Sequence, residues 1–126
     1  MEKNLKINKS HIIILYTIKL LNNLGYYPNE NGVYKIVNGI LDNETEPFKQ
    51  IETFSTLVSF SSKKICRYVL ALSRYGYINK IYSKPINELL LSLSEKGEDE
   101  LFNVLNHKKI HFIKHEKKVK RTIFKF

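Results

Sequence analysis

The chain has 126 residues, the size of one domain, and its 43% hydrophobic and 26% charged residues exclude a largely disordered protein. Its net charge of +9 and pI near 9.6 favour a polyanionic partner. The longest apolar run, residues 12–16, is too short for a membrane span and no cleavage site follows it, so we expect a cytoplasmic protein.

Two helices are predicted within the first 40 residues. Ser10 is expected to cap a first helix, whose apolar positions recur at helical spacing until Gly25 ends it. Those positions are Ile14, Leu15, Ile18, Leu21 and Leu24. After a turn-rich loop over residues 26–32, apolar residues at positions 33, 36, 37 and 40 predict a short second helix that breaks near Gly39.

Two more helices are predicted between residues 46 and 75. Residues 42–46 form an acidic linker, and Pro47 suits the first turn of a helix over residues 46–58, with apolar residues at 48, 51, 54, 57 and 58. The next helix, residues 62–75, follows two N-cap candidates, Ser61 and Ser62, and ends at Gly76. Its predicted apolar face consists of Ile65, Tyr68, Val69 and Leu72.

A β-hairpin and a fifth helix complete the predicted domain. Residues 77–82 have strand composition, residues 83–87 can turn, and residues 89–93 can return as a second strand. Ser94 is expected to cap a helix with acidic side chains in its first turn. Leu101, Phe102 and Leu105 are its predicted core anchors.

The last twenty residues, 107–126, carry +7 of the net charge, which leaves +2 for residues 1–106. The predicted polyanion-binding residues of this basic tail are Lys108, Lys109, Lys114, Lys117, Lys118, Lys120 and Arg121. A solubilising tail is the alternative. Three further interpretations of the tail stay open. It could form a strand docked on the domain or on a partner, or an amphipathic membrane anchor. It could also hold a metal through His107, His111 and His115, which recur every four residues. The cationic, β-branched composition disfavours the metal site.

The order of these elements is that of a winged helix. In a helix-turn-helix, the second helix enters the major groove, about 12 Å wide, while the preceding helix braces it. Helix 46–58 would brace and helix 62–75 would recognise DNA. We therefore predict a single α+β, mostly helical domain over residues 1–106, a winged helix-turn-helix with a β-hairpin wing, followed by the tail.

Two stretches of the predicted domain are Ser62-Lys-Lys-Ile-Cys-Arg-Tyr-Val-Leu-Ala-Leu-Ser-Arg-Tyr-Gly-Tyr-Ile and Leu91-Ser-Leu-Ser-Glu-Lys-Gly. They resemble the RQC domain, the winged-helix module found C-terminal in RecQ-family DNA helicases. The isoleucine-rich first helix, Ile36-Val-Asn-Gly39 and Phe54-Ser-Thr56 extend the resemblance over residues 11–105. It implies a stand-alone winged helix that binds double-stranded DNA.

The resemblance also implies where DNA is contacted. It places backbone contacts at the start of the recognition helix and in the wing. The residues concerned are Ser61, Ser62, Lys63, Lys64, Lys80 and Lys84. Arg67 and Arg74 lie on the polar side of the same predicted helix. In some family members an aromatic side chain at the wing tip opens the duplex; Tyr82 lies near the tip, and whether this wing separates strands stays open.

Catalysis has little support in the sequence. The glycines are scattered singly, so no phosphate-binding loop is present, and no nucleophile–base arrangement can be argued. Cys66 cannot form an internal disulfide and is expected to be a structural thiol. We expect neither a cofactor nor a metal. Four tyrosines, Tyr68, Tyr75, Tyr77 and Tyr82, could stack on bases, but packing at the edge of the core is favoured.

The function predicted from the sequence is binding of duplex DNA, chiefly through phosphate contacts. One alternative is a dimeric winged-helix transcription regulator that binds a palindromic site. The other is a protein-interaction module without DNA binding. Double-stranded DNA is the predicted partner, and a membrane is not expected to be one. A second copy of the chain or another DNA-processing protein remains open.

Overall fold

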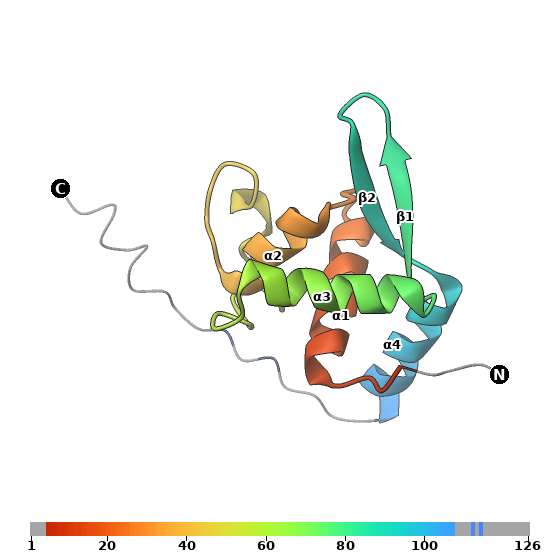
Figure 1. The fold of residues 1–126 in the computed structure, drawn as a ribbon. Helices are drawn as coiled ribbons and strands as arrows, with labels where there is room; N and C mark the ends of the chain where they lie inside the picture. Colours follow the sequence, from red (N-terminus) through yellow and green to blue (C-terminus); the bar gives the residue numbers. More distant parts are fainter. Residues whose placement is uncertain (1–4, 108–111, 113, 115–126) are drawn as a thin grey trace.

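The computed structural model describes residues 5–107, 112 and 114. This part of the chain contains four α-helices, one short 3-10 helix and one two-stranded antiparallel hairpin (Figure 1). In chain order the elements are α1 (Lys9–Asn23), α2 (Glu30–Asn38), η1 (Glu46–Phe48), α3 (Ser62–Arg74), β1 (Ile78–Ser83), β2 (Glu88–Leu93) and α4 (Glu95–His107). The predicted α+β class is confirmed. Across the described residues, every helix is too short or too polar to cross a membrane.

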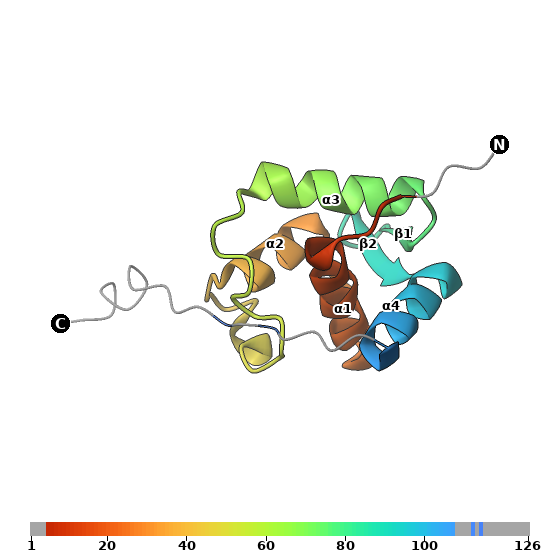
Figure 2. The same cartoon turned by 90° about the horizontal axis from the view of Figure 1, so that it is seen from below.

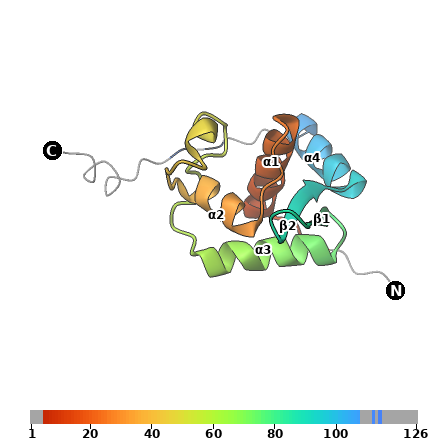
Figure 3. The same ribbon diagram turned by 90° about the horizontal axis from the view of Figure 1, so that it is seen from above.

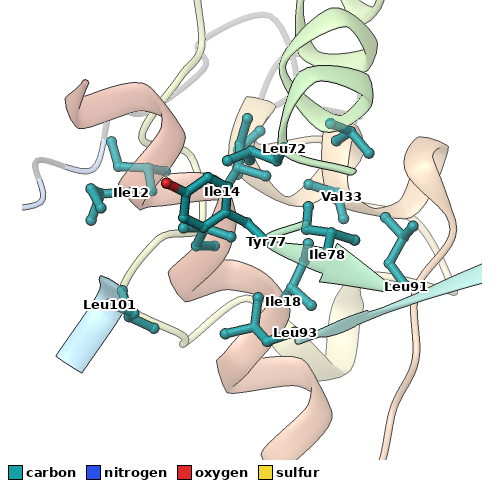
Figure 4. Close-up of a cluster of buried hydrophobic side chains, with 14 of the residues drawn as sticks. Ile12, Ile14, Ile18, Val33, Leu72, Tyr77, Ile78, Leu91, Leu93 and Leu101 are labelled. Atoms are coloured by element: carbon teal, nitrogen blue, oxygen red, sulfur yellow. The ribbon is translucent and has the colours of Figure 1, made fainter. Parts of the chain in front are cut away.

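Helix α1 is the centre of the domain. It lies between α2 and α4, with α3 packed across it (Figure 2). Its residues 11–15 are all buried, so the helix is enclosed on most sides, as expected for a helix that is apolar nearly all round. Ile14 and Ile18 pack in one cluster with residues of α2, α3, the hairpin and α4 (Figure 4).

The first helix begins two residues earlier than predicted, and its cap differs. The side chain of Asn8, not Ser10, accepts the backbone N–H of His11 at 3.0 Å. In return, His11 Nδ1 accepts the backbone N–H of Asn8 at 3.0 Å, which completes a capping box. At the other end, Leu24 was expected on the apolar face but lies at the C-cap, 63% exposed.

The predicted second helix is confirmed as α2, and Gly39 ends it in a left-handed conformation at φ +85°. A β-carbon at Gly39 would lie 2.5 Å from Ser55 Oγ, so the end of α2 touches the segment that precedes α3. Glycine is therefore required here both for its backbone angle and for close packing.

The predicted third helix, residues 46–58, is wrong. Only Glu46–Phe48 form a short 3-10 helix, and successive turns follow it up to residue 60. Several of these turns close with bonds between residues three apart, such as Phe54 N to Ile51 O at 3.1 Å. The apolar residues at 48, 51 and 54 also recur every three residues, which fits the 3.0-residue repeat of such turns better than an α-helix.

Contacts with the end of α2 explain why no α-helix forms. The backbone N–H groups of Ser55 and Leu57 donate to the carbonyls of Ile36 at 2.8 Å and Val37 at 2.7 Å. An α-helix would need those N–H groups for its own ladder. Ser55 also has a φ of +66°, outside the right-handed helical region.

The predicted fourth helix and hairpin are confirmed. Ile65, Val69 and Leu72 of α3 are fully buried. The hairpin pairs from Ile78↔Leu93 to Ser83↔Glu88. Its base is buried in the core, whereas its distal half projects from the body (Figure 1). Figure 3 looks down on the hairpin and shows α3 along one edge of the molecule beside it.

The predicted fifth helix is α4, and Ser94 Oγ caps it by accepting the N–H of Gly97 at 3.0 Å. Leu101 is buried as predicted, but Phe102 and Leu105 are 66% and 38% exposed, so two of the three expected anchors are wrong. Val104 is buried instead. The reason lies at Gly97, where a β-carbon would be 2.2 Å from the Tyr77 carbonyl oxygen; this close approach turns the 97–101–104 face inward.

Candidate nucleic-acid interface

Helix α3 separates its apolar and cationic side chains cleanly. Its sequence contains four basic residues and no acidic residue. The four, all exposed, are Lys63, Lys64, Arg67 and Arg74. Burial of the opposite face against α1 and α2 fixes the orientation of the helix, so these cations face away from the core.

The start of α3 offers hydrogen-bond donors beside these cations. Ser61 is the N-cap, and its Oγ accepts the N–H of Lys64 at 3.1 Å. The N–H of Ile65 is bonded to the Ser61 carbonyl, whereas those of Ser62 and Lys63 have no acceptor within the described part of the chain. Unpaired N–H groups and the positive end of the helix dipole favour an anion here.

Ion pairs elsewhere leave most of the α3 cations available. The carboxylates in ion pairs are Glu98 with Lys19, Asp42 and Glu44 with Lys35, Glu46 with Lys49, and Glu30 with Lys80. Within residues 5–107, Lys63, Arg67 and Arg74 have no carboxylate partner. Lys64 Nζ lies 4.4 Å from the centre of the Phe60 ring.

The two predicted lysines of the wing differ in their surroundings. Lys80 Nζ lies 3.5 Å from Glu30 Oε2, on the side of the hairpin that faces α2. Glu88 lies on the same side and accepts a hydrogen bond from Asn29 at 2.9 Å. Lys84, in the turn of the hairpin, is exposed and has no ion pair with any described residue. The hairpin therefore presents its cation at the tip more freely than at its base.

An open groove of about 290 Å³ adjoins the cations, between α3 and the first turn of α1. It is lined by His11, Lys64, Arg67, Tyr68 and Ala71. Burial lowers the pKa of His11, so its imidazole is neutral at pH 7. His11 was not predicted as a site residue, although the Asn-x-x-His spacing of residues 8–11 resembles a capping box and would have placed it in the first turn.

The other side chains singled out in the sequence lie as follows. Tyr77 is buried at 5% exposure, and Tyr68 and Tyr75 pack partly against the core, whereas Tyr82 is 55% exposed on the projecting hairpin. Burial and the nearby Glu30 carboxylate raise the pKa of the Cys66 thiol, so this thiol stays protonated at neutral pH.

Most of the basic tail lies outside the described residues, as do His111 and His115 of the histidine series. Of the predicted tail contacts, only Lys114 is described, and it is exposed. Phe112 is partly buried, and its ring centre lies 5.3 Å from that of Tyr16 on α1. Comparison of the chain with protein-family models, curated proteins and solved structures finds no match.

Proposed function

We propose that this protein binds double-stranded DNA through the exposed face of α3, with the hairpin as a wing. The observation that carries the proposal is the charge pattern of α3, in which four exposed cations have no acidic residue among them. Because Lys63, Arg67 and Arg74 form no ion pair with a described residue, phosphates can bind them without first breaking a protein salt bridge.

The arrangement of elements supports the interpretation of the domain as a winged helix, with a different bracing helix from the one predicted. Since the helix expected over residues 46–58 is absent, α2 is the preceding helix; it packs against α3 together with α1 and would brace it. A helix-turn-helix usually has a turn of three or four residues, whereas residues 39–61 join α2 to α3 here. The hairpin follows α3 directly and stands beside it (Figure 3).

The upstream motifs on which the resemblance to the RQC domain is based contact one another. Ile36-Val-Asn-Gly39 and Phe54-Ser-Thr56 are separated in sequence but touch, because the Ser55 N–H donates to the Ile36 carbonyl and Gly39 packs on the Ser55 side chain. Two motifs that hold one another in place explain why both would be needed ahead of the DNA-binding helix.

Binding of this kind reads mainly the DNA backbone. Lys63, Arg67 and the free N–H groups at the start of α3 would contact phosphates, and Lys84 would contact a phosphate from the wing. The +7 charge of residues 107–126 would add affinity that does not depend on sequence. We expect a steep fall in affinity as salt increases, with a modest preference among sequences.

The test is fluorescence anisotropy with a labelled duplex over a salt series. Lys63→Ala/Arg67→Ala should weaken binding to all duplexes alike and reduce the slope of log K against log salt by about 2, near one unit for each phosphate that no longer binds a cation. The matched control, Lys19→Ala/Lys49→Ala, removes the same charge from α1 and from the residue that follows η1, and should keep most of the slope.

Equal losses of affinity in the two double variants would mean that only net charge matters, which would contradict a dedicated α3 interface. No binding by the wild-type protein would favour a protein-interaction module instead. Circular dichroism of each variant establishes that the helices are retained.

A dimeric regulator is the second candidate. The observation that favours it is the outer face of α4, where the apolar side chains of Phe102 and Leu105 are exposed. A dimer through this face would carry two copies of α3, which suits half-sites about 34 Å apart. Sedimentation equilibrium distinguishes this candidate from a monomer.

A further inference from the structure

The groove beside α3 combines two kinds of wall. Lys64 and Arg67 contribute cations from the exposed side of the helix, and Tyr68 and His11 contribute rings from the side that faces α1. The His11 and Tyr68 rings meet edge to face, with centres 4.7 Å apart at 82°. Phe60 extends this aromatic group, because its ring lies 6.0 Å from that of Tyr68. The rings are held by packing and offer a fixed surface.

His11 adds a hydrogen-bond donor to this surface. It is only 6% exposed, and its Nδ1 accepts the Asn8 N–H, so the neutral imidazole carries its proton on Nε2. No described group accepts that proton. No fully buried side-chain nitrogen or oxygen in the described residues lacks a partner, and His11 lines the groove, so we infer that Nε2 is open to it.

The cations, the aromatic rings and the His11 N–H donor together match one kind of ligand. A planar ring with polar edges would stack on Tyr68 and accept the His11 N–H, while an attached anion would bind Lys64 or Arg67. An unstacked nucleobase on a phosphodiester chain has both parts. Bases inside a duplex are stacked and paired, so only a single-stranded or extrahelical base can enter without a large cost.

We propose that this groove holds one unpaired nucleobase from a single-stranded end that continues the duplex bound on α3. The inference rests on the proposed function and specifies its substrate: duplex DNA with a single-stranded overhang. Such a substrate binds more tightly than a blunt duplex, because it adds a stacked base to the phosphate contacts.

The test compares a blunt duplex with the same duplex bearing a three-nucleotide overhang of either polarity, with 2-aminopurine in the overhang. Wild-type protein should bind one of the two overhang duplexes at least about fivefold more tightly than the blunt duplex. This factor corresponds to the lower end of the range of free energies for stacking one base on an aromatic side chain. Stacking should also change the 2-aminopurine fluorescence. Tyr68→Leu should remove the preference and the fluorescence change while leaving blunt-duplex affinity intact, and Tyr68→Phe should retain both.

Tyr27→Leu is the matched control, because Tyr27 is 45% exposed in the loop after α1 and outside the groove; it should behave as wild type. If Tyr68→Leu does not fold, His11→Gln replaces it, since glutamine at this position retains the capping box but lacks the aromatic edge. This variant should lose most of the preference.

Equal affinity of wild-type protein for blunt and overhang duplexes would overturn this inference and leave the proposed function standing. A preference that survives in folded Tyr68→Leu would also overturn it. Absence of binding to either DNA would overturn the proposed function, and the inference with it.

Discussion

His11 has three roles in the domain. Its Nδ1 completes the cap of α1, its ring packs against Tyr68, and it lines the groove beside two cations of α3. The cap needs a neutral imidazole, because a protonated Nδ1 could not accept the Asn8 N–H, and a charged ring in the groove would be repelled by Lys64 and Arg67. Burial, which lowers the pKa of His11, keeps it neutral.

This predicts a pH dependence of stability. The pKa of His11 is lower in the folded chain than its ordinary value of 6.5, so at intermediate pH the unfolded chain binds more protons. The free energy of unfolding should therefore fall as pH drops below about 7 and level off below the folded-state pKa. His11→Gln keeps an acceptor for Asn8 but does not titrate.

Urea denaturation of both proteins between pH 5 and 8 measures the effect. The other three histidines are common to both chains, so the difference in unfolding free energy isolates His11. We expect the advantage of wild type over His11→Gln to shrink as pH falls. A difference that does not vary with pH would show that His11 is not held neutral by the fold.

At the scale of elements, the segment between α2 and α3 is organised by Asn38. Its buried side-chain amide donates to the carbonyls of Leu57 at 3.3 Å, Val58 at 3.2 Å and Phe60 at 2.8 Å. These carbonyls are in the irregular stretch that replaces the predicted helix, so one side chain satisfies groups that a helix would otherwise pair. Since Phe60 is one residue before the Ser61 cap, Asn38 also positions the start of α3.

Asn38→Asp tests this role with almost no change of shape. At neutral pH a carboxylate would face three carbonyl oxygens, and we expect a loss of about 3 kcal/mol or more in unfolding free energy. The unfavourable surroundings would raise the carboxyl pKa in the folded state, so the loss should lessen as pH falls toward 4 and grow as pH rises.

Asn103→Asp, on the exposed side of α4, is the control and should change stability by no more than about 0.5 kcal/mol. Equal stability of the two variants at pH 7, measured by urea denaturation, would show that the Asn38 amide is not what holds the segment.

The elements that sequence reasoning predicted correctly are those set by local signals. Gly39 and Gly76, Ser61 and Ser94, and the apolar face of α3 mark helix ends and faces within a few residues of chain. Residues 46–58 were predicted wrongly because their pairing groups, Ile36 and Val37, lie about twenty residues away. The same limit applies to the site. The cations of α3 could be predicted from the helical pattern of residues 62–75 alone, whereas the groove could not, because it joins α3 to His11 of α1.

At the scale of the whole molecule, charge is unevenly distributed. Residues 107–126 hold +7 of the +9 net charge, and α3 holds four cations on one exposed face. The tail would attract any polyanion over a distance of about a Debye length, near 8 Å at physiological salt. The α3 face would instead set where the duplex lies, because its cations are fixed by the buried side of the helix.

The central claim is that α3 and the hairpin tip, rather than the tail alone, contact the duplex. An NMR titration of ¹⁵N-labelled protein with a short duplex tests it most directly, because each backbone amide reports its own surroundings. We predict that the largest shift changes fall on residues 61–74 and 83–87, with little change in α4. Changes confined to residues 107–126, or absent from α3, would contradict the account.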